Sequence, residues 1–102
     1  MAELEGEELG LREILKHLDR ESAHFVVRVE SVPSSRKVTV VEPHELIRDS
    51  LDLPRLLHQM KERLGTGGSV ENGRMILHGD HREQVRAELV KFGVAAENIE
   101  LI

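Results

Sequence analysis

Hydrophobic and polar residues alternate in some segments of this chain and recur at helical spacing in others. Residues 24–32 (HFVVRVESV) and 37–42 (KVTVVE) are rich in β-branched side chains, and apolar and polar positions alternate along much of both. Such alternation places one face of a strand in a core and the other in solvent. The residues between them, 33–36, include Pro and Ser. The pattern predicts a β-hairpin whose tip carries Arg36 and Lys37.

Residues 53–64 carry a single apolar face at helical spacing. Its members are Leu53, Leu56, Leu57, Met60 and Leu64. Asp52 is a suitable N-cap, Pro54 is tolerated in the first turn, and Gly65 occupies the favoured C-terminal position. We therefore expect a helix between Asp52 and Gly65, with Leu57 and Met60 buried.

A second hairpin is indicated by residues 69–71 and 74–78, which flank Asn72 and Gly73. Asn-Gly is the preferred pair for a type I′ turn, because both positions need a positive φ. Gly79 then separates the second strand from Asp80.

The last part of the chain predicts a helix followed by a strand. Asp80 is interpreted as the N-cap, and Glu83 completes a capping box with it. The apolar stripe consists of Val85, Leu89 and Phe92, and Gly93 ends the helix. Residues 98–102 are predicted to form a short final strand.

The order of these elements indicates the fold class. Residues 7–20 predict an additional amphipathic helix, and residues 43–50 are expected to be a connector. The remaining order is β-β-α-β-β-α-β. Two amphipathic helices each need an apolar surface, and one sheet supplies it, so we expect an α+β, two-layer sandwich with both helices on one face. The domains are an N-terminal extension, residues 1–22, and a folded domain, residues 23–102.

Composition narrows the class of protein further. The 102 residues correspond to about one domain, and with two Phe, no Trp and no Tyr the core must be aliphatic. The absence of Cys excludes disulfides and thiolate metal sites. The acidic N-terminus does not resemble a signal peptide, and no stretch approaches the ~20 apolar residues of a membrane span. We expect a soluble cytoplasmic protein, monomeric and without a membrane partner.

The charge is unevenly distributed along the chain. The net charge is −5, of which residues 1–22, with three basic and seven acidic residues, carry −4. Residues 23–102 are therefore nearly neutral. A local basic surface on the folded domain is compatible with this distribution.

The glycine-rich stretch at residues 63–85 contains neither a phosphate-binding loop motif nor a dinucleotide fingerprint. The residues interpreted as structural joints are Gly67, Gly68, Gly73, Gly79 and Asp80, of which Gly67-Gly68 is expected to be a flexible pair. Two chemical interpretations stay open: Asp80-His81-Arg82 as an acid–base cluster of a small hydrolase, and His78 with His81 as metal ligands. The favoured interpretation is non-catalytic, with the Asp80 carboxylate occupied as a cap, and with no metal and no cofactor.

A family resemblance rests on residues 53–102 together with the RKVTVVE segment ahead of them. The features are a helix ending in basic residues, Gly-Gly-Ser-Val, a turn, a short strand, Gly-Asp-His-Arg, a helix, Gly and a terminal strand. This combination resembles the eukaryotic and archaeal translation initiation factor 1 family, particularly its archaeal and small divergent members, and not the bacterial factor of the same number. The resemblance covers about residues 24–102.

The resemblance implies a non-catalytic role on the small ribosomal subunit near the P site, in contact with rRNA, where family members help to reject non-initiator codons. It implies rRNA as the partner, with other initiation factors as further partners. Carried onto this sequence, the rRNA-contacting residues are Arg36, Lys37, Arg55, Lys61 and Arg63.

The chain departs from the family pattern where Glu62 interrupts the basic helix end and where the hairpin loop is Pro-Ser-Ser rather than Gly-rich and basic. The alternative function is therefore a protein-interaction module on the same fold, a divergent paralogue whose N-terminal helix binds a protein.

Overall fold

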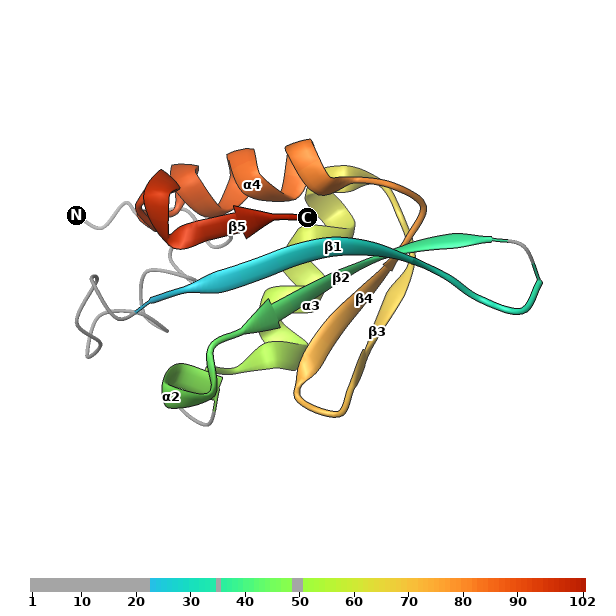
Figure 1. Ribbon diagram of the computed structural model, residues 1–102, viewed down its shortest axis with the longest axis horizontal. Helices are drawn as coiled ribbons and strands as arrows, with labels where there is room; N and C mark the ends of the chain where they lie inside the picture. Colours follow the sequence, from blue (N-terminus) through green and yellow to red (C-terminus); the bar gives the residue numbers. More distant parts are fainter. Residues whose placement is uncertain (1–22, 35, 49–50) are drawn as a thin grey trace.

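A five-stranded mixed sheet, in the order β3-β4-β2-β1-β5, forms one layer of the protein (Figure 1). The computed structural model describes residues 23–34, 36–48 and 51–102. The helix predicted over residues 7–20 lies outside these described ranges. The strands are β1 (Phe25–Ser31), β2 (Lys37–Pro43), β3 (Gly68–Glu71), β4 (Arg74–His78) and β5 (Ile99–Leu101), and the helices are α2 (Glu45–Arg48), α3 (Leu53–Leu64), α4 (Arg82–Lys91) and the 3-10 turn η2 (Ala96–Asn98).

The predicted first hairpin is confirmed. β1 and β2 pair antiparallel from Phe25 opposite Pro43 to Ser31 opposite Lys37. Phe25 and Val27 on β1 are buried in the core. The alternating sequence therefore specifies the strands and the face that β1 buries, whereas β2 is buried on both faces from Val38 to Val41.

The second hairpin forms around the predicted Asn72-Gly73 turn. Both residues have positive φ, 54° and 78°, as a type I′ turn requires. Residues 43–50, expected to be a plain connector, contain the one-turn helix α2. This element was not predicted, because four residues give too short a segment for a periodic pattern to be visible. Ile47 of α2 is 1% exposed and belongs to the core.

Helix α3 begins and ends where its capping residues predict. The Asp52 carboxylate accepts a hydrogen bond of 3.2 Å from the Arg55 backbone N–H. Gly65 is left-handed, with φ 64°, and its N–H donates to the Lys61 carbonyl. The side chains of Leu57 and Met60 are buried, as predicted.

Helices α3 and α4 lie on one face of the sheet. Their buried side chains join the inward-facing strand residues in one aliphatic core. That core contains Phe25, Val27, Val41, Leu56, Leu57, Met60, Met75, Leu77, Val85, Leu89 and Ile99 among others. The opposite face of the sheet carries no helix of the described chain (Figure 1). No helix within the described ranges is long and apolar enough to cross a membrane.

The Gly67-Gly68 pair is a tightly packed joint rather than a flexible spacer. A Cβ on Gly68 would lie 2.3 Å from the carbonyl oxygen of Ile76 on the neighbouring strand β4. A Cβ on Gly67 would lie 3.2 Å from the ring of His78. The close approach of β3 to β4 therefore requires glycine at position 68.

Gly68→Ala is expected to lower the free energy of unfolding by about 3 kcal/mol, the upper part of the range for overpacking, because the obstructing atom belongs to the main chain. Gly65→Ala is the matched control, since a Cβ there meets nothing within 4 Å and its cost comes only from the left-handed backbone, about 1–2 kcal/mol. Urea denaturation measures both. Equal losses would show that β3 can move away from β4 at little cost.

Candidate nucleic-acid interface

The tip of the β1–β2 hairpin presents two of the predicted RNA-contacting residues to solvent. Arg36 and Lys37 are exposed. The Val32 N–H donates to the Arg36 carbonyl at 2.9 Å, which closes the loop beyond the last ladder pair of Ser31 and Lys37. Neither cationic side chain makes an ion pair within the described part of the chain.

The C-terminal end of α3 carries the next two predicted residues, which have different surroundings. The side chain of Lys61 is half-buried. Arg63 is only 21% exposed, with its guanidinium 3.7 Å from the Glu88 carboxylate and 5.5 Å from the centre of the Phe92 ring. Glu88 lies on α4, and Phe92 is the residue that ends this helix. The structure thus places Arg63 between α3 and α4, where it contributes an ion pair and a cation–π contact to helix packing.

Arg55 lies at the opposite end of α3. It is exposed, and its backbone N–H belongs to the Asp52 cap. Six residues of helix correspond to about 9 Å along the axis between Arg55 and Lys61. Arg55 is therefore separated from the end of the helix that carries Lys61.

Three hydrogen bonds, one from a side-chain hydroxyl and two between backbone groups, connect the end of α3 to the start of β2. The Thr66 hydroxyl donates to the His78 carbonyl at 2.9 Å, and the His78 N–H donates to the Gly67 carbonyl at 3.0 Å. The Gly79 N–H then donates to the Lys37 carbonyl at 2.8 Å. The sheet thereby brings Lys37 to the same end of the molecule as Lys61, although 24 positions separate them in sequence.

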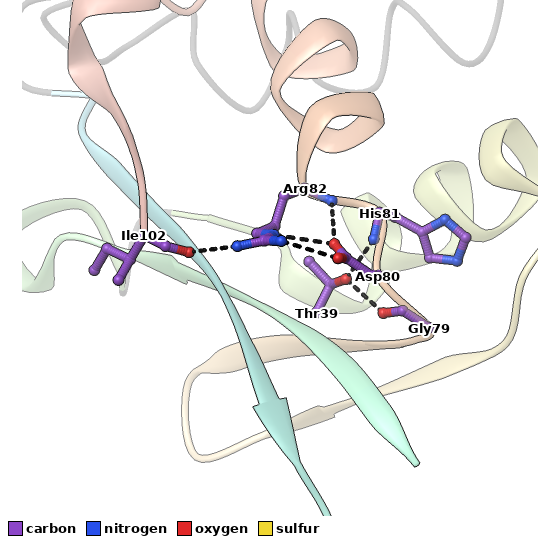
Figure 2. A network of polar contacts seen from close by, with 6 residues as sticks. All are labelled: Thr39, Gly79, Asp80, His81, Arg82 and Ile102. Atoms are coloured by element: carbon purple, nitrogen blue, oxygen red, sulfur yellow. Dashed lines mark hydrogen bonds and ion pairs between the residues drawn. The ribbon is translucent and has the colours of Figure 1, made fainter.

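The segment that joins β4 to α4 is held by a buried hydroxyl, as Figure 2 shows. Thr39 on β2 is fully buried, and its hydroxyl donates to the Gly79 carbonyl at 2.6 Å. The same oxygen accepts a hydrogen bond of 2.8 Å from the His81 backbone N–H. A single side chain thus satisfies two backbone groups where the chain leaves the sheet, on either side of Asp80.

Thr39→Val, which keeps the side-chain shape, is expected to lower the free energy of unfolding by about 1–3 kcal/mol, because two backbone groups lose their partner. Thr39→Ser keeps the hydroxyl and loses one methyl, at a cost of about 0.8 kcal/mol. Thermal unfolding followed by circular dichroism compares them. A Val variant as stable as the Ser variant would mean that the hydroxyl contributes little.

The predicted capping role of Asp80 is wrong. Helix α4 begins at Arg82, its N-cap position is His81, and no side chain caps it. The Asp80 carboxylate instead makes two contacts with the Arg82 guanidinium, at 3.0 and 2.9 Å, and only a long one of 3.4 Å with the Arg82 backbone N–H. The fork of a guanidinium matches both carboxylate oxygens, so it displaces the capping arrangement.

Arg82 also binds the end of the chain. Its second terminal nitrogen donates to the Ile102 carbonyl at 2.9 Å (Figure 2). These contacts connect the end of β4 to β2 and to Ile102, the residue after β5, through the segment Gly79-Asp80-His81-Arg82. Sequence reasoning singled out this cluster but did not identify its partners, which come from distant parts of the chain.

The electrostatics of Asp80 do not favour acid–base catalysis. The hydrogen bonds from Arg82, and to a smaller extent the charge of Lys37, lower the pKa of the Asp80 carboxyl. A general acid at neutral pH needs a raised pKa, and a general base needs one closer to neutrality. The His81 ring lies 2.7 Å from the His78 carbonyl rather than against Asp80. In the ranges that the structure describes, no group of three or more His, Cys, Asp or Glu side chains is arranged to bind a metal ion.

Comparison with known proteins identifies the family to which this chain belongs. The family model for translation initiation factor SUI1 matches residues 21–95. The protein translation factor SUI1 homolog of Aeropyrum pernix is 38% identical over 90 residues, covering 88% of this chain and 87% of the relative. The homolog of Hyperthermus butylicus is 37% identical over 90 residues, covering 88% and 85%. That of Sulfurisphaera tokodaii is 34% identical over 90 residues, covering 88% of each chain. This chain belongs to the SUI1 family of translation initiation factors.

Proposed function

We propose that this protein acts in translation initiation by binding the small ribosomal subunit near the P site and contributing to start-codon selection, without a catalytic step. Family membership supports the role in initiation. The resemblance of residues 24–102 to translation initiation factor 1 supports the location on the subunit.

The proposed contact with rRNA rests on the exposure and the ion pairing of the cationic side chains at the hairpin tip. Arg28 and Arg82 are neutralised by carboxylates at 2.7–3.0 Å, and Arg63 faces Glu88. Arg36 and Lys37 are exposed and have no such partner within the described residues. Exposed, unneutralised cations at the end of a protruding hairpin are suited to contact phosphates, which give affinity without reading sequence.

The remaining predicted residues take different parts in the proposed interface. Lys61 lies at the end of α3 that is bonded through Gly67 and His78 to the start of β2, so we place it in the same surface as Lys37. Arg55 extends the contact along α3. Arg63 acts through the packing of α3 against α4, since its guanidinium is turned toward Phe92.

Co-sedimentation of the full chain with purified small ribosomal subunits tests the proposal. We expect binding at low salt that weakens as KCl is raised, with a slope of about 0.7–0.9 in the logarithmic plot for each phosphate contacted. Binding that persists unchanged at high salt would indicate the alternative, recognition of a protein partner. An absence of binding at low salt would contradict the proposed function.

A further inference from the structure

The face of the sheet opposite the helices contains a hollow between the first hairpin and strand β4. Its volume is about 660 Å³. Met75 and Leu77 of β4 belong to the core. The residues that alternate with them point to the opposite face, where they line the hollow: Arg74, Ile76 and His78. A cation, an aliphatic side chain and an imidazole therefore follow one another along about 13 Å of strand.

The neighbouring strands widen this row into a surface with an apolar centre. Val38 of β2 lies directly opposite His78, and Ser69 of β3 lies opposite Ile76, and both line the hollow. His78 is exposed. On its other side stands Gly67, where a Cβ would lie 3.2 Å from the imidazole. The glycine at position 67 thus leaves room for the His78 ring at one end of the apolar centre.

Positive charge exceeds negative charge around the hollow. Besides His78, the ionisable side chains that line it are Glu30, Arg36, Lys37, Glu71 and Arg74. None of the three cations makes an ion pair with another described residue, whereas Glu30 accepts a hydrogen bond of 2.9 Å from Arg28. Lys37 adjoins Val38 at the His78 end, and Arg74 lies at the other end of the row. Charge complementarity therefore favours an anionic ligand that reaches both ends.

A nucleotide of unpaired RNA has the chemistry that these features match. Its base has two apolar faces that stack on aromatic rings, histidine included, and it is flanked by two anionic phosphates. Val38 and Ile76 offer apolar surface, and the His78 ring offers a stacking partner. A free inorganic anion would make no use of the apolar centre. The volume also lies within the range of about 300–1,000 Å³ that is usual for small-molecule sites.

We propose that this hollow binds one unpaired nucleotide of RNA, with the base against Ile76 and the His78 ring and the flanking phosphates beside Lys37 and Arg74. The proposal rests on the proposed function for the choice of RNA as the ligand, and it adds a contact with a base to the contacts with phosphates. Phosphate contacts give affinity alone, whereas a base site distinguishes unpaired RNA from a duplex, whose bases are already stacked.

Titration of the full chain with short RNAs, followed by NMR, tests the site. The two probes are a single-stranded RNA and an abasic strand with the same number of phosphates. We expect the intact strand to shift the amide signals of Ile76 and His78. It should also bind at least about fivefold more tightly than the abasic strand, which is the lower limit for the stacking of one base.

Two variants assign the contacts. His78→Ala should remove most of the preference for the intact strand and leave the affinity for the abasic strand unchanged. His58→Ala, at an exposed position of α3, is the matched control and should keep the preference. Arg74→Gln should weaken binding of both strands by the same factor and reduce the salt slope by about 0.7, as expected for one phosphate of a single strand. Thermal unfolding confirms beforehand that each variant is folded.

Equal affinity for the two strands, or binding of neither, would overturn the nucleotide site. A polyglutamate peptide that shifts the Ile76 and His78 signals when RNA does not would overturn it as well, and would identify an acidic protein segment as the occupant. Co-sedimentation with small ribosomal subunits separates this site from the proposed function. A chain that binds subunits without a base preference keeps the proposed function alone, and a chain that shows the preference without binding subunits keeps the nucleotide site alone.

Discussion

Replacing Leu56 by alanine is expected to lower the free energy of unfolding by about 2–5 kcal/mol. Leu56 is fully buried on the apolar face of α3, within the core that both helices share with the sheet. Truncation removes apolar area from the core and leaves a cavity that the surrounding side chains fill only in part. A domain of this size has a total stability of about 5–10 kcal/mol, so a large fraction would be lost.

Chemical denaturation of the full chain measures this loss. Val90→Ala on α4 is the control, since Val90 is 42% exposed and its truncation should change stability by less than about 0.5 kcal/mol. A Leu56 variant that unfolds at the same denaturant concentration as the original protein would show that α3 does not pack on the sheet as described.

Reversing the charge of both hairpin cations, with Arg36→Glu and Lys37→Glu, is expected to weaken small-subunit binding by at least about tenfold, because a hydrogen bond to a charged group contributes about 1.5–3 kcal/mol. The slope of affinity against salt should fall by about 1.4–1.8, because two phosphates are no longer neutralised by the protein. Both positions are exposed, so the fold should be unaffected. Filter binding or co-sedimentation over a range of KCl concentrations gives both quantities.

The matched control for this reversal uses Arg86→Glu and Lys91→Glu on α4, which change the net charge by the same amount. Lys91 lies 3.8 Å from Glu88, so thermal unfolding of this variant is compared first to confirm that it is folded. Equal weakening by the two pairs would mean that only total charge governs binding. Intact binding by both variants would remove the hairpin tip from the RNA interface.

The elements that the sequence determined are those whose signals are local. The Asn72-Gly73 turn needs two positive φ angles, and the α3 cap needs a carboxylate three residues before Arg55. The alternation along β1 and the apolar stripe of α3 likewise predicted which side chains are buried. These preferences act between residues close in the chain, so they hold before the fold is known.

Gly68 and Arg63 were interpreted from their neighbours in sequence, but their roles are decided by contacts with residues on other elements. Gly68 is required by the carbonyl of Ile76, which approaches only when β3 pairs with β4. Arg63, predicted to be part of a basic helix end, meets Glu88 on α4 and Phe92 at the end of that helix. Neither contact has a periodic or motif signal, because each depends on how two elements are packed.

For Asp80, too, a local sequence signal favoured one role and the contacts in the folded structure decided another. Its position before a helix and Glu83 three residues later favoured an N-cap, but two guanidinium contacts with Arg82 occupy the carboxylate, while Thr39 from β2 binds the backbone on both sides. The sequence by itself determined the hairpins, the two long helices and the family. Only the tertiary structure decided which cations have no ion-pair partner among the described residues, because this depends on side chains that strand pairing and helix packing bring together from separate parts of the chain.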